Sequence, residues 1–320
     1  MNRPHCALMV GTAIVVAAIA LSGCKRESAN GEAAMNAPSA AAMAFARSEQ
    51  AWRDKRRNDL LKPDGWTSLV GLHWLDPGAH YIGSDAGNGI HLSMGPAHLG
   101  MVDIHGKQVR FVPDKATTLT LDGQPLAATA LVRTDADPAG PSVIGFDDDK
   151  GHATVIQRNQ RYALRVKHAD APSRTQFAGL DYWPADPAWK VEGKFVPHEA
   201  GKTIEIANVI GGTDAMANPG VVEFLHGGQA YRLEALDEGE GVLFMVFADR
   251  TNGHGSYGAG RFLDAPMPDA RNRVVLDFNH ARNPPCAFSA FATCPLPPPE
   301  NRLDLTISAG EKAYRKSPHS

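Results

Sequence analysis

The sequence predicts an all-β protein, built of two small antiparallel β-sandwich or β-barrel modules and preceded by one helix. Beyond residue 62, Gly and Pro interrupt the chain at intervals of about eight to twelve residues. The runs between them are short and often alternate between apolar and polar residues, as in KTIEIANVI, GVLFMVFADR and RVVLDF. This pattern is typical of antiparallel sheets rather than of parallel βαβ units.

Residues 1–23 predict a lipoprotein signal peptide. Arg3 precedes an apolar run over residues 7–20, and small residues follow it, which is the order of a secretory signal. The run is shorter than the roughly 20 residues that a membrane-spanning helix needs. Leu21-Ser22-Gly23-Cys24 resembles the lipobox of bacterial lipoproteins, and this resemblance implies that Cys24 is the lipidated residue. An ordinary signal peptide with an accidental Cys is the alternative.

Residues 24–42 are expected to be a flexible tether, because they lack apolar periodicity and are rich in Ala, Ser, Asn and Gly. Lys25 follows the lipidated position. In the lipoproteins that this segment resembles, a residue other than Asp at that position implies export to the outer membrane. We therefore expect a periplasmic protein whose partner is the outer membrane, reached through the lipid anchor at Cys24.

The charge balance gives no indication of a nucleic-acid partner. The chain contains 32 Lys and Arg against 35 Asp and Glu, a formal net charge of −3. The one basic cluster that stands out is RDKRR at residues 53–57, which is small for a surface that binds phosphate backbones.

Residues 43–61 form the one convincing helix of the sequence. Phe45, Trp52 and Leu60 can share one face, and Pro63 lies where the helical pattern ends. After the helix, residues 62–150 are expected to form the first β module and residues 151–320 the second.

The first module resembles a forkhead-associated domain in three stretches, which are residues 81–85, 88–92 and 121–126. That family holds phosphothreonine with an Arg after the first Gly and with a Ser-x-x-His. Here Ser84 replaces the Arg, and His98 has Gly95 three residues before it. We expect this module to share the β-sandwich fold but not to bind phosphopeptides, because without the Arg a phosphate group has no bidentate partner.

The stretch GHGSYG at residues 253–258 matches G-x-G-x-x-G. The sequence after it lacks the helix that a dinucleotide site needs, so no cofactor is expected. Ser256 lies near His254 and Asp249 in the sequence, and together with Asp277 these residues define an alternative function, a periplasmic hydrolase. The helix that follows a nucleophile elbow is also missing.

Thirteen His residues raise the question of a metal site. No closely spaced pair occurs, and a folded site would have to gather distant residues, such as His198, His226, His254 and His280, with Asp277. Solvated loop His residues are the default interpretation, and no metal is expected.

The segment from Asn283 to Glu300 must be a loop with extended pieces, because its prolines fix φ and lack amide donors. Cys286 and Cys294 are the only thiols left once the signal peptide is removed and Cys24 is lipidated. In an oxidising compartment we predict a disulfide between them, and a redox-active pair is the alternative. Phe288 and Phe291 between the two Cys are expected to bury into the core.

The run from Val274 to Lys312 resembles the hallmark of a bacterial family known as domain of unknown function (DUF) 1684. Residues 247–253, 257–262 and 71–75 fit the same family. The resemblance covers most of the chain after about residue 45 and supplies no activity. Arg282 departs from the pattern, because an aromatic residue is expected there, and this change can alter a pocket lining.

Seven residues within the proline-rich loop, or near it, are candidates for the lining of a small-ligand pocket. They are Tyr257, Arg261, Asp277, Asn279, Asn283, Asn301 and Arg302. The alternative is that the Asp and Asn side chains cap the backbone of a loop that lacks ladder partners. The sequence therefore predicts a ligand-binding or structural module of the bacterial envelope.

Overall fold

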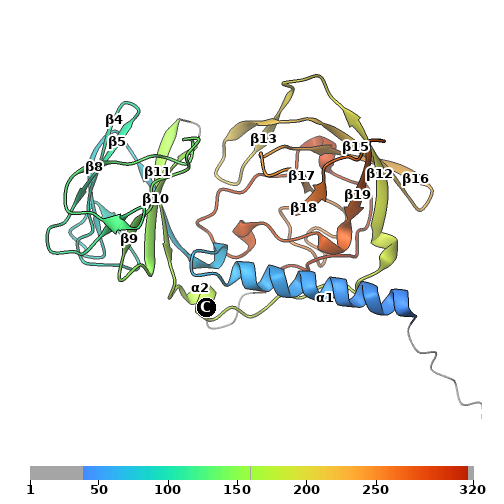
Figure 1. Cartoon of the computed structure of the whole chain (residues 1–320), viewed down its shortest axis with the longest axis horizontal. Coiled ribbons are helices and arrows are strands. Elements are labelled where there is room, and N and C mark those ends of the chain that lie inside the picture. The colour runs from blue at the N-terminus through green and yellow to red at the C-terminus, as the bar shows by residue number, and fades with distance from the viewer. Residues whose placement is uncertain (1–38, 159, 316–320) are drawn as a thin grey trace, which may run out of the picture. The chain divides into compact units, whose positions relative to one another are not determined.

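The structure is a computed structural model, and it describes residues 39–158 and 160–315 (Figure 1). The predicted signal peptide, the lipidated Cys24 and nearly all of the predicted tether lie outside the described residues. From Ala40 onward the chain forms one compact unit. It consists mostly of β-strands, so the predicted all-β class is confirmed. No described helix is both long enough and apolar enough to cross a membrane.

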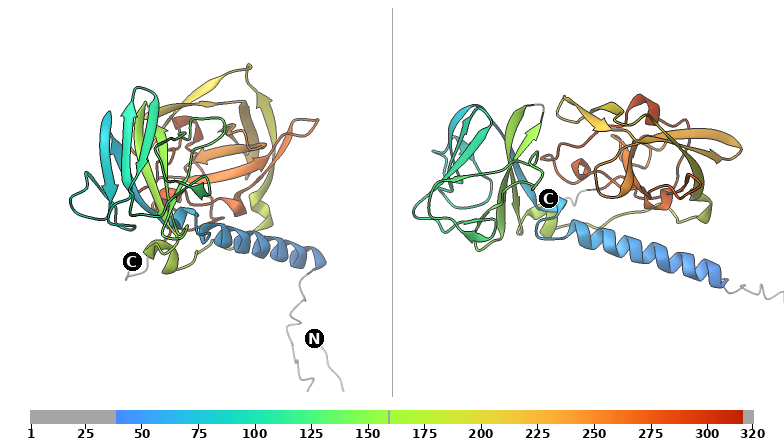
Figure 2. Two further views of the ribbon diagram at one scale, coloured as in Figure 1. Left: turned by 60° about the vertical axis from the view of Figure 1, so that its left-hand side comes forward. Right: turned by 45° about the horizontal axis from the view of Figure 1, so that its top comes forward.

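Helix α1 (Ala40–Leu60) begins three residues before the predicted start. Its inner face follows helical spacing through the half-buried Phe45 and Trp52 to the buried Leu60. Two of the positions on this face are polar, since Glu49 is 4% exposed and Arg56 is half-buried. In Figures 1 and 2, α1 lies along one side of the strands that follow residue 190.

The N-terminal module comprises strands β1 to β11 in two sheets. The first sheet has the order β1-β11-β10-β9-β6-β7 and the second β3-β2-β4-β5-β8. The bounds are β1 (Leu69–Leu75), β2 (Gly78–Gly83), β3 (Ile90–His91), β4 (Gly100–His105), β5 (Gln108–Pro113), β6 (Thr120–Leu121), β7 (Gln124–Pro125), β8 (Ala130–Leu131), β9 (Ile144–Phe146), β10 (Gly151–Arg158) and β11 (Arg161–His168). One core lies between the sheets and includes Ile82, Phe111, Phe146 and Leu164.

The predicted boundary between the modules at residue 150 is wrong. The acidic residues 147–149 all have positive φ, which is a tight reversal rather than a linker. This turn joins β9 to β10, which pair with Ala153 opposite Ile144. The first module therefore continues through β11 to His168.

The C-terminal module comprises strands β12 to β19. Its main sheet has the order β16-β15-β12-β19, and β13-β14 and β17-β18 form separate pairs. The bounds are β12 (Lys190–Pro197), β13 (Thr203–Ala207), β14 (Thr213–Ala217), β15 (Gly220–His226), β16 (Gln229–Ala235), β17 (Val242–Phe247), β18 (Arg261–Pro266) and β19 (Arg273–Asp277). The short helix α2 (Pro172–Thr175) lies in the connection between the modules. The core of the C-terminal module includes Phe195, Val222, Leu263 and Phe278.

The proline-rich loop contains no strand, as predicted, and folds into single 3-10 turns. They are η4 (Pro285–Ala287) and η5 (Pro299–Asn301), and η3 (Phe278–His280) precedes them. Phe288 is 3% exposed and packs on Phe177 and Tyr314, so its predicted burial is confirmed. The same prediction for Phe291 is wrong, because that ring is 36% exposed.

The glycine-rich stretch at residues 253–258 is a turn between strands. Gly255 has a φ of 123°, and a Cβ there would lie 2.6 Å from the ring of Trp183. Strand β18 follows this stretch, so the expected absence of a dinucleotide-type helix after it agrees with the structure.

Candidate functional site

A cavity of about 380 Å³ opens beside the proline-rich loop. Its lining comes from α1, from strands β10 and β11, from the 238–240 segment and from the loop. The lining residues are Arg56, Leu60, Trp66, Arg158, Arg165, Glu238, Glu240, Phe244, Phe262, Arg282, Asn283, Pro285, Phe288, Ala292, Thr293, Cys294 and Pro295. A second cavity of about 570 Å³ shares Arg56, Leu60, Trp66 and Arg282 with the first. Together they make one extended depression.

Three of the four Arg side chains in the first cavity are neutralised by a carboxylate. Arg56 pairs with the fully buried Glu311 at 2.7 Å, and Arg158 pairs with Asp135 at 2.6 Å. Arg282 pairs with Asp264 at 2.7 Å. These three guanidinium groups line the cavity, but each already has a carboxylate as its counterion.

Arg165 differs from the other three. It makes no ion pair with any residue that the structure describes, and its Nε is buried without a hydrogen-bond partner. Its Nη2 donates one long hydrogen bond, of 3.3 Å, to Thr293 Oγ1, and the guanidinium lies 5.7 Å from the centroid of Trp66. Burial is the main cause that lowers the pKa of Arg165, and Arg158 adds to it. The charge of Asp135, which is already paired with Arg158, partly offsets this effect. An arginine stays protonated in proteins, so this position holds a partly desolvated charge with no described carboxylate at ion-pair distance.

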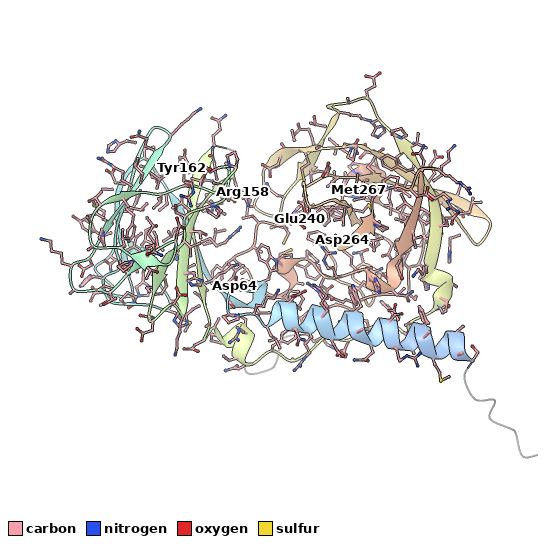
Figure 3. All side chains as sticks on the ribbon, in the orientation of Figure 1. Asp64, Arg158, Tyr162, Glu240, Asp264 and Met267 are labelled. Carbon is pink, nitrogen blue, oxygen red and sulfur yellow. The ribbon has the colours of Figure 1, made fainter. Side chains whose placement is uncertain are left out.

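Two carboxylates, those of Glu238 and Glu240, line the same cavity. Burial, reinforced by the neighbouring Glu240, raises the pKa of Glu238. Figure 3 shows Glu240 before β17 and Arg158 on β10, on the sides of the two modules that face each other. Asn283 lines the cavity as well, and its Oδ1 is buried without a partner, whereas its Nδ2 donates to Lys312 O at 2.7 Å. The cavity thus contains an unpaired donor and an unpaired acceptor.

The two Cys residues lie beside each other at the base of the loop. Both are free cysteines in the structure, and the amide N of Cys286 donates to Cys294 Sγ at 3.0 Å. The Cys294 thiol, followed by the Tyr257 hydroxyl, donates to the Cys286 sulfur and lowers the pKa of Cys286 against the effect of burial. The same contact raises the pKa of Cys294. The disulfide stays a prediction, and in the reduced protein these contacts favour the thiolate of Cys286 over that of Cys294.

Three of the seven predicted ligand-facing residues bind backbone groups instead. Arg261 is 0% exposed and pairs with Asp249 at 2.6 Å. Asn279 binds both backbone groups of Asp186, and Asn301 accepts from Glu234 N while donating to Glu234 O.

The other four residues predicted to line a pocket lie in different surroundings. Tyr257 packs against the cluster of Leu60 and Phe288, and Arg302 is exposed. Asp277 accepts from the amide of Asn279 at 3.2 Å. Of the seven predicted residues, only Asn283 lines the cavity.

The residues of the hydrolase alternative do not assemble a nucleophile and a base. Ser256 is 1% exposed, and its Oγ accepts from Trp183 Nε1 at 3.1 Å and from Thr251 Oγ1 at 2.8 Å. Within the described part of the chain, no hydrogen bond joins Ser256 to the exposed His254, and the carboxylate of Asp249 is bound to Arg261. A general base must be within hydrogen-bond reach of the hydroxyl it activates.

Sequence reasoning missed Arg165, Trp66 and Glu238. A usable signal was present in β11, where Arg165, Val166 and Lys167 alternate between a basic and an apolar side chain. Lys167 also makes no ion pair among the described residues, and its Nζ donates to Asp64 O at 2.5 Å. The Nζ atom of Lys167 lies 5.4 Å from the centroid of the Trp66 ring.

Comparison with known proteins finds a family match for the C-terminal part of this chain. Residues 175–312 match the family model described as Protein of unknown function (DUF1684). An uncharacterized protein of Haloarcula marismortui, whose solution NMR structure is known, is 32% identical over 43% of this chain and 78% of that chain, with a TM-score of 0.37. None of the curated proteins compared with the chain is significantly similar to it.

Proposed function

From the premise that this chain belongs to the DUF1684 family, whose description assigns no activity, we propose that it is a ligand-binding module of the bacterial envelope. The ligand is a small molecule that carries a carboxylate and an ammonium group, such as an amino acid or a short peptide. It binds in the cavity between Arg165 and the segment that contains Glu238.

The observation that carries the proposal is that Arg165 has no ion-pair partner of its own, since the nearby Asp135 is paired with Arg158. Its Nε is buried without a partner and its guanidinium makes no ion pair among the described residues. A guanidinium presents a fork of donors that matches a carboxylate. A carboxylate in the cavity therefore provides both the missing counterion and the missing acceptor.

The two carboxylates that line the cavity select against a ligand that is purely anionic. Glu238 and Glu240 would repel a second negative charge, whereas an ammonium group would neutralise them. Asn283 Oδ1 offers a further acceptor for an N–H group. The rings of Phe244, Phe262 and Phe288 supply apolar walls, and the volume of about 380 Å³ is in the range of small-molecule sites.

The N-terminal segment supports a proposal for the location of the protein in the cell. We propose that Cys24 is acylated, that residues 25–39 tether the folded unit, and that the protein is held on the periplasmic side of the outer membrane. The lipobox-like LSGC and Lys25 support this location.

Thermal unfolding in the presence of a ligand panel tests the proposal. The panel contains free amino acids and dipeptides, each matched with its N-acetyl form and its carboxamide form. A free form that binds at a concentration well above its Kd should raise the Tm by at least about 2 °C. Its two blocked forms should not do so. No shift with any free form would contradict the proposal.

Two variants on the same strand make the test specific. Arg165→Gln removes the guanidinium in the cavity and should abolish the shift. Arg161→Gln is the matched control, because Arg161 is exposed and packs over Trp74 outside the cavity. A shift that survives in Arg165→Gln would place the ligand elsewhere.

A further inference from the structure

A group of metal-binding side chains lies where α1 meets the C-terminal module. Glu49 on α1, Asp277 at the end of β19 and His280 in η3 each point one ligand atom into the same space, and these atoms all lie within 4.8 Å of one another. We propose that these three residues form a binding site for a divalent transition-metal ion.

The ion pair with His280 satisfies only one of the two carboxylate oxygens of Glu49. Glu49 is 4% exposed, and its Oε1 lies 3.1 Å from His280 Nε2. Its Oε2 is buried and has no hydrogen-bond partner. Buried carboxylate oxygens are normally satisfied, and an ion held by this carboxylate would satisfy the second oxygen.

The spacing also suits a shared ion. Ligand atoms that bind one Zn²⁺ at about 2.1 Å lie about 3.0–3.4 Å from each other. The separation of 3.1 Å between Glu49 and His280 falls within this range. The ligand atom of Asp277 lies within 4.8 Å of the other two.

The imidazole is positioned by its surroundings before any ion binds. The ring of His280 stacks on Trp52 with centroids 4.5 Å apart and an interplanar angle of 5°. Its side chain is 30% exposed, and both rings line the cavity of about 570 Å³, which gives an ion and its remaining water ligands access from solvent. Asp277 is oriented by Asn279, whose Nδ2 donates to its Oδ1 at 3.0 Å.

One cation competes for the site. Lys190 Nζ lies 3.6 Å from Asp277 Oδ2, but its side chain is 57% exposed and can move into solvent. Two carboxylates and one imidazole suit Mn²⁺ and Zn²⁺. Mn²⁺ is the better probe here, because Zn²⁺ also binds thiolates and the chain contains Cys286 and Cys294.

Calorimetric titration of the purified full-length protein with Mn²⁺, and then with Zn²⁺, tests the site. We expect one saturable equivalent of Mn²⁺. Glu49→Gln and His280→Gln should each weaken its binding about 100-fold or more, since even changes behind the ligands cost 10–100-fold. If either variant does not fold, Asp277→Asn serves the same purpose.

A second Glu–His pair gives a matched control. His198 Nε2 lies 2.8 Å from the buried Glu234 Oε2, and this pair has no third metal-binding group beside it in the described chain. Glu234→Gln and His198→Gln should therefore leave Mn²⁺ binding unchanged. Wild-type protein that binds no Mn²⁺, or binding that is equally strong in Glu49→Gln and His280→Gln, would overturn the proposal.

Discussion

The guanidinium of Arg261 lies 2.6 Å from the carboxylate of Asp249, and neither side chain is exposed to solvent. The same guanidinium donates to the backbone oxygens of Ile307 and Ala309, and Asp249 Oδ1 accepts from the amide of Thr251. The pair therefore connects strand β18 to the C-terminal segment that carries the family resemblance. Its role is to hold the backbone, since no ligand can reach it.

Asp249→Asn should destabilise the protein strongly. The substitution leaves the charge of Arg261 buried without its partner, and removing one member of a buried pair costs about 3–5 kcal/mol. Urea unfolding measures the change in the free energy of unfolding. Asp304→Asn is the control, because it breaks the exposed pair with Arg250 and should cost less than about 1 kcal/mol. Equal effects of the two substitutions would contradict a structural role for the buried pair.

The stability of the N-terminal module should depend on pH through His73. Burial, and to a smaller extent the nearby His91, lowers the pKa of His73 below its ordinary value of 6.5. Its Nε2 is buried without a partner. The unfolded chain thus binds this proton more readily than the folded chain. The stabilisation is fully present above pH 6.5 and is lost as the pH falls toward the lower, folded-state pKa.

Chemical unfolding at several pH values between about 5 and 8 checks this dependence. The loss of stability on acidification should be smaller in His73→Gln than in the unmodified protein. His105→Gln is the control, because that side chain is 65% exposed, and it should not flatten the profile. An unchanged acid slope in His73→Gln would show that His73 is not the responsible group.

Periodicity was sufficient to predict the all-β class and the long helix, because alternation and helical spacing are local properties. It failed at the modular boundary, since the acidic turn at residues 147–149 resembles a linker although the strands on its two sides pair with each other. The sequence also did not reveal which polar side chains are buried. Asn279 and Asn301 looked like ligand-facing residues, and only the fold reveals that they are inside it and bound to backbone groups.

Asp277, His280 and Asn283 were already candidates from the sequence, whereas Glu49 and Arg165, the central residues of the two proposed sites, were not. Glu49 lies on the inner face of α1, between Phe45 and Trp52, but its partners are more than 220 positions away in the chain. Arg165 reads as an exposed strand residue, and only the approach of Thr293 from the proline-rich loop turns it into part of a cavity. Long-range proximity of this kind has no signature in a single sequence.

Cys24→Ala should release the protein from the membrane. Acylation at Cys24 would be the anchor, as the lipobox-like LSGC suggests. Membrane pellets washed with high salt, then probed for the protein, measure the effect. The unmodified chain should stay in the pellet and the variant should move to the soluble fraction. Salt-resistant sedimentation of Cys24→Ala would exclude lipidation as the main anchor.

The thiol pair of the proline-rich loop should be oxidised in protein isolated from the periplasm. Thiol titration of the denatured, unreduced protein should then find neither Cys286 nor Cys294. Their bridge would close a loop of nine residues, for which chain entropy predicts a stabilisation of about 2.5 kcal/mol. The double substitution Cys286→Ser with Cys294→Ser should lower the free energy of unfolding by about that amount.

The reduced protein provides a second and independent readout of the same pair. Because hydrogen bonds from the Cys294 thiol and the Tyr257 hydroxyl lower the pKa of Cys286, iodoacetamide should modify Cys286 first, with half-maximal rate below the ordinary thiol pKa of 9.0. Tyr257→Phe should shift that midpoint upward. Tyr314→Phe is the control, since this ring belongs to the same aromatic cluster and its hydroxyl contacts Ala178 N instead. Equal alkylation rates at the two Cys of the reduced protein would contradict this arrangement.

The disulfide itself would be contradicted by two reactive thiols in freshly isolated, unreduced protein. Burial of Phe288 would then be what holds this end of the loop.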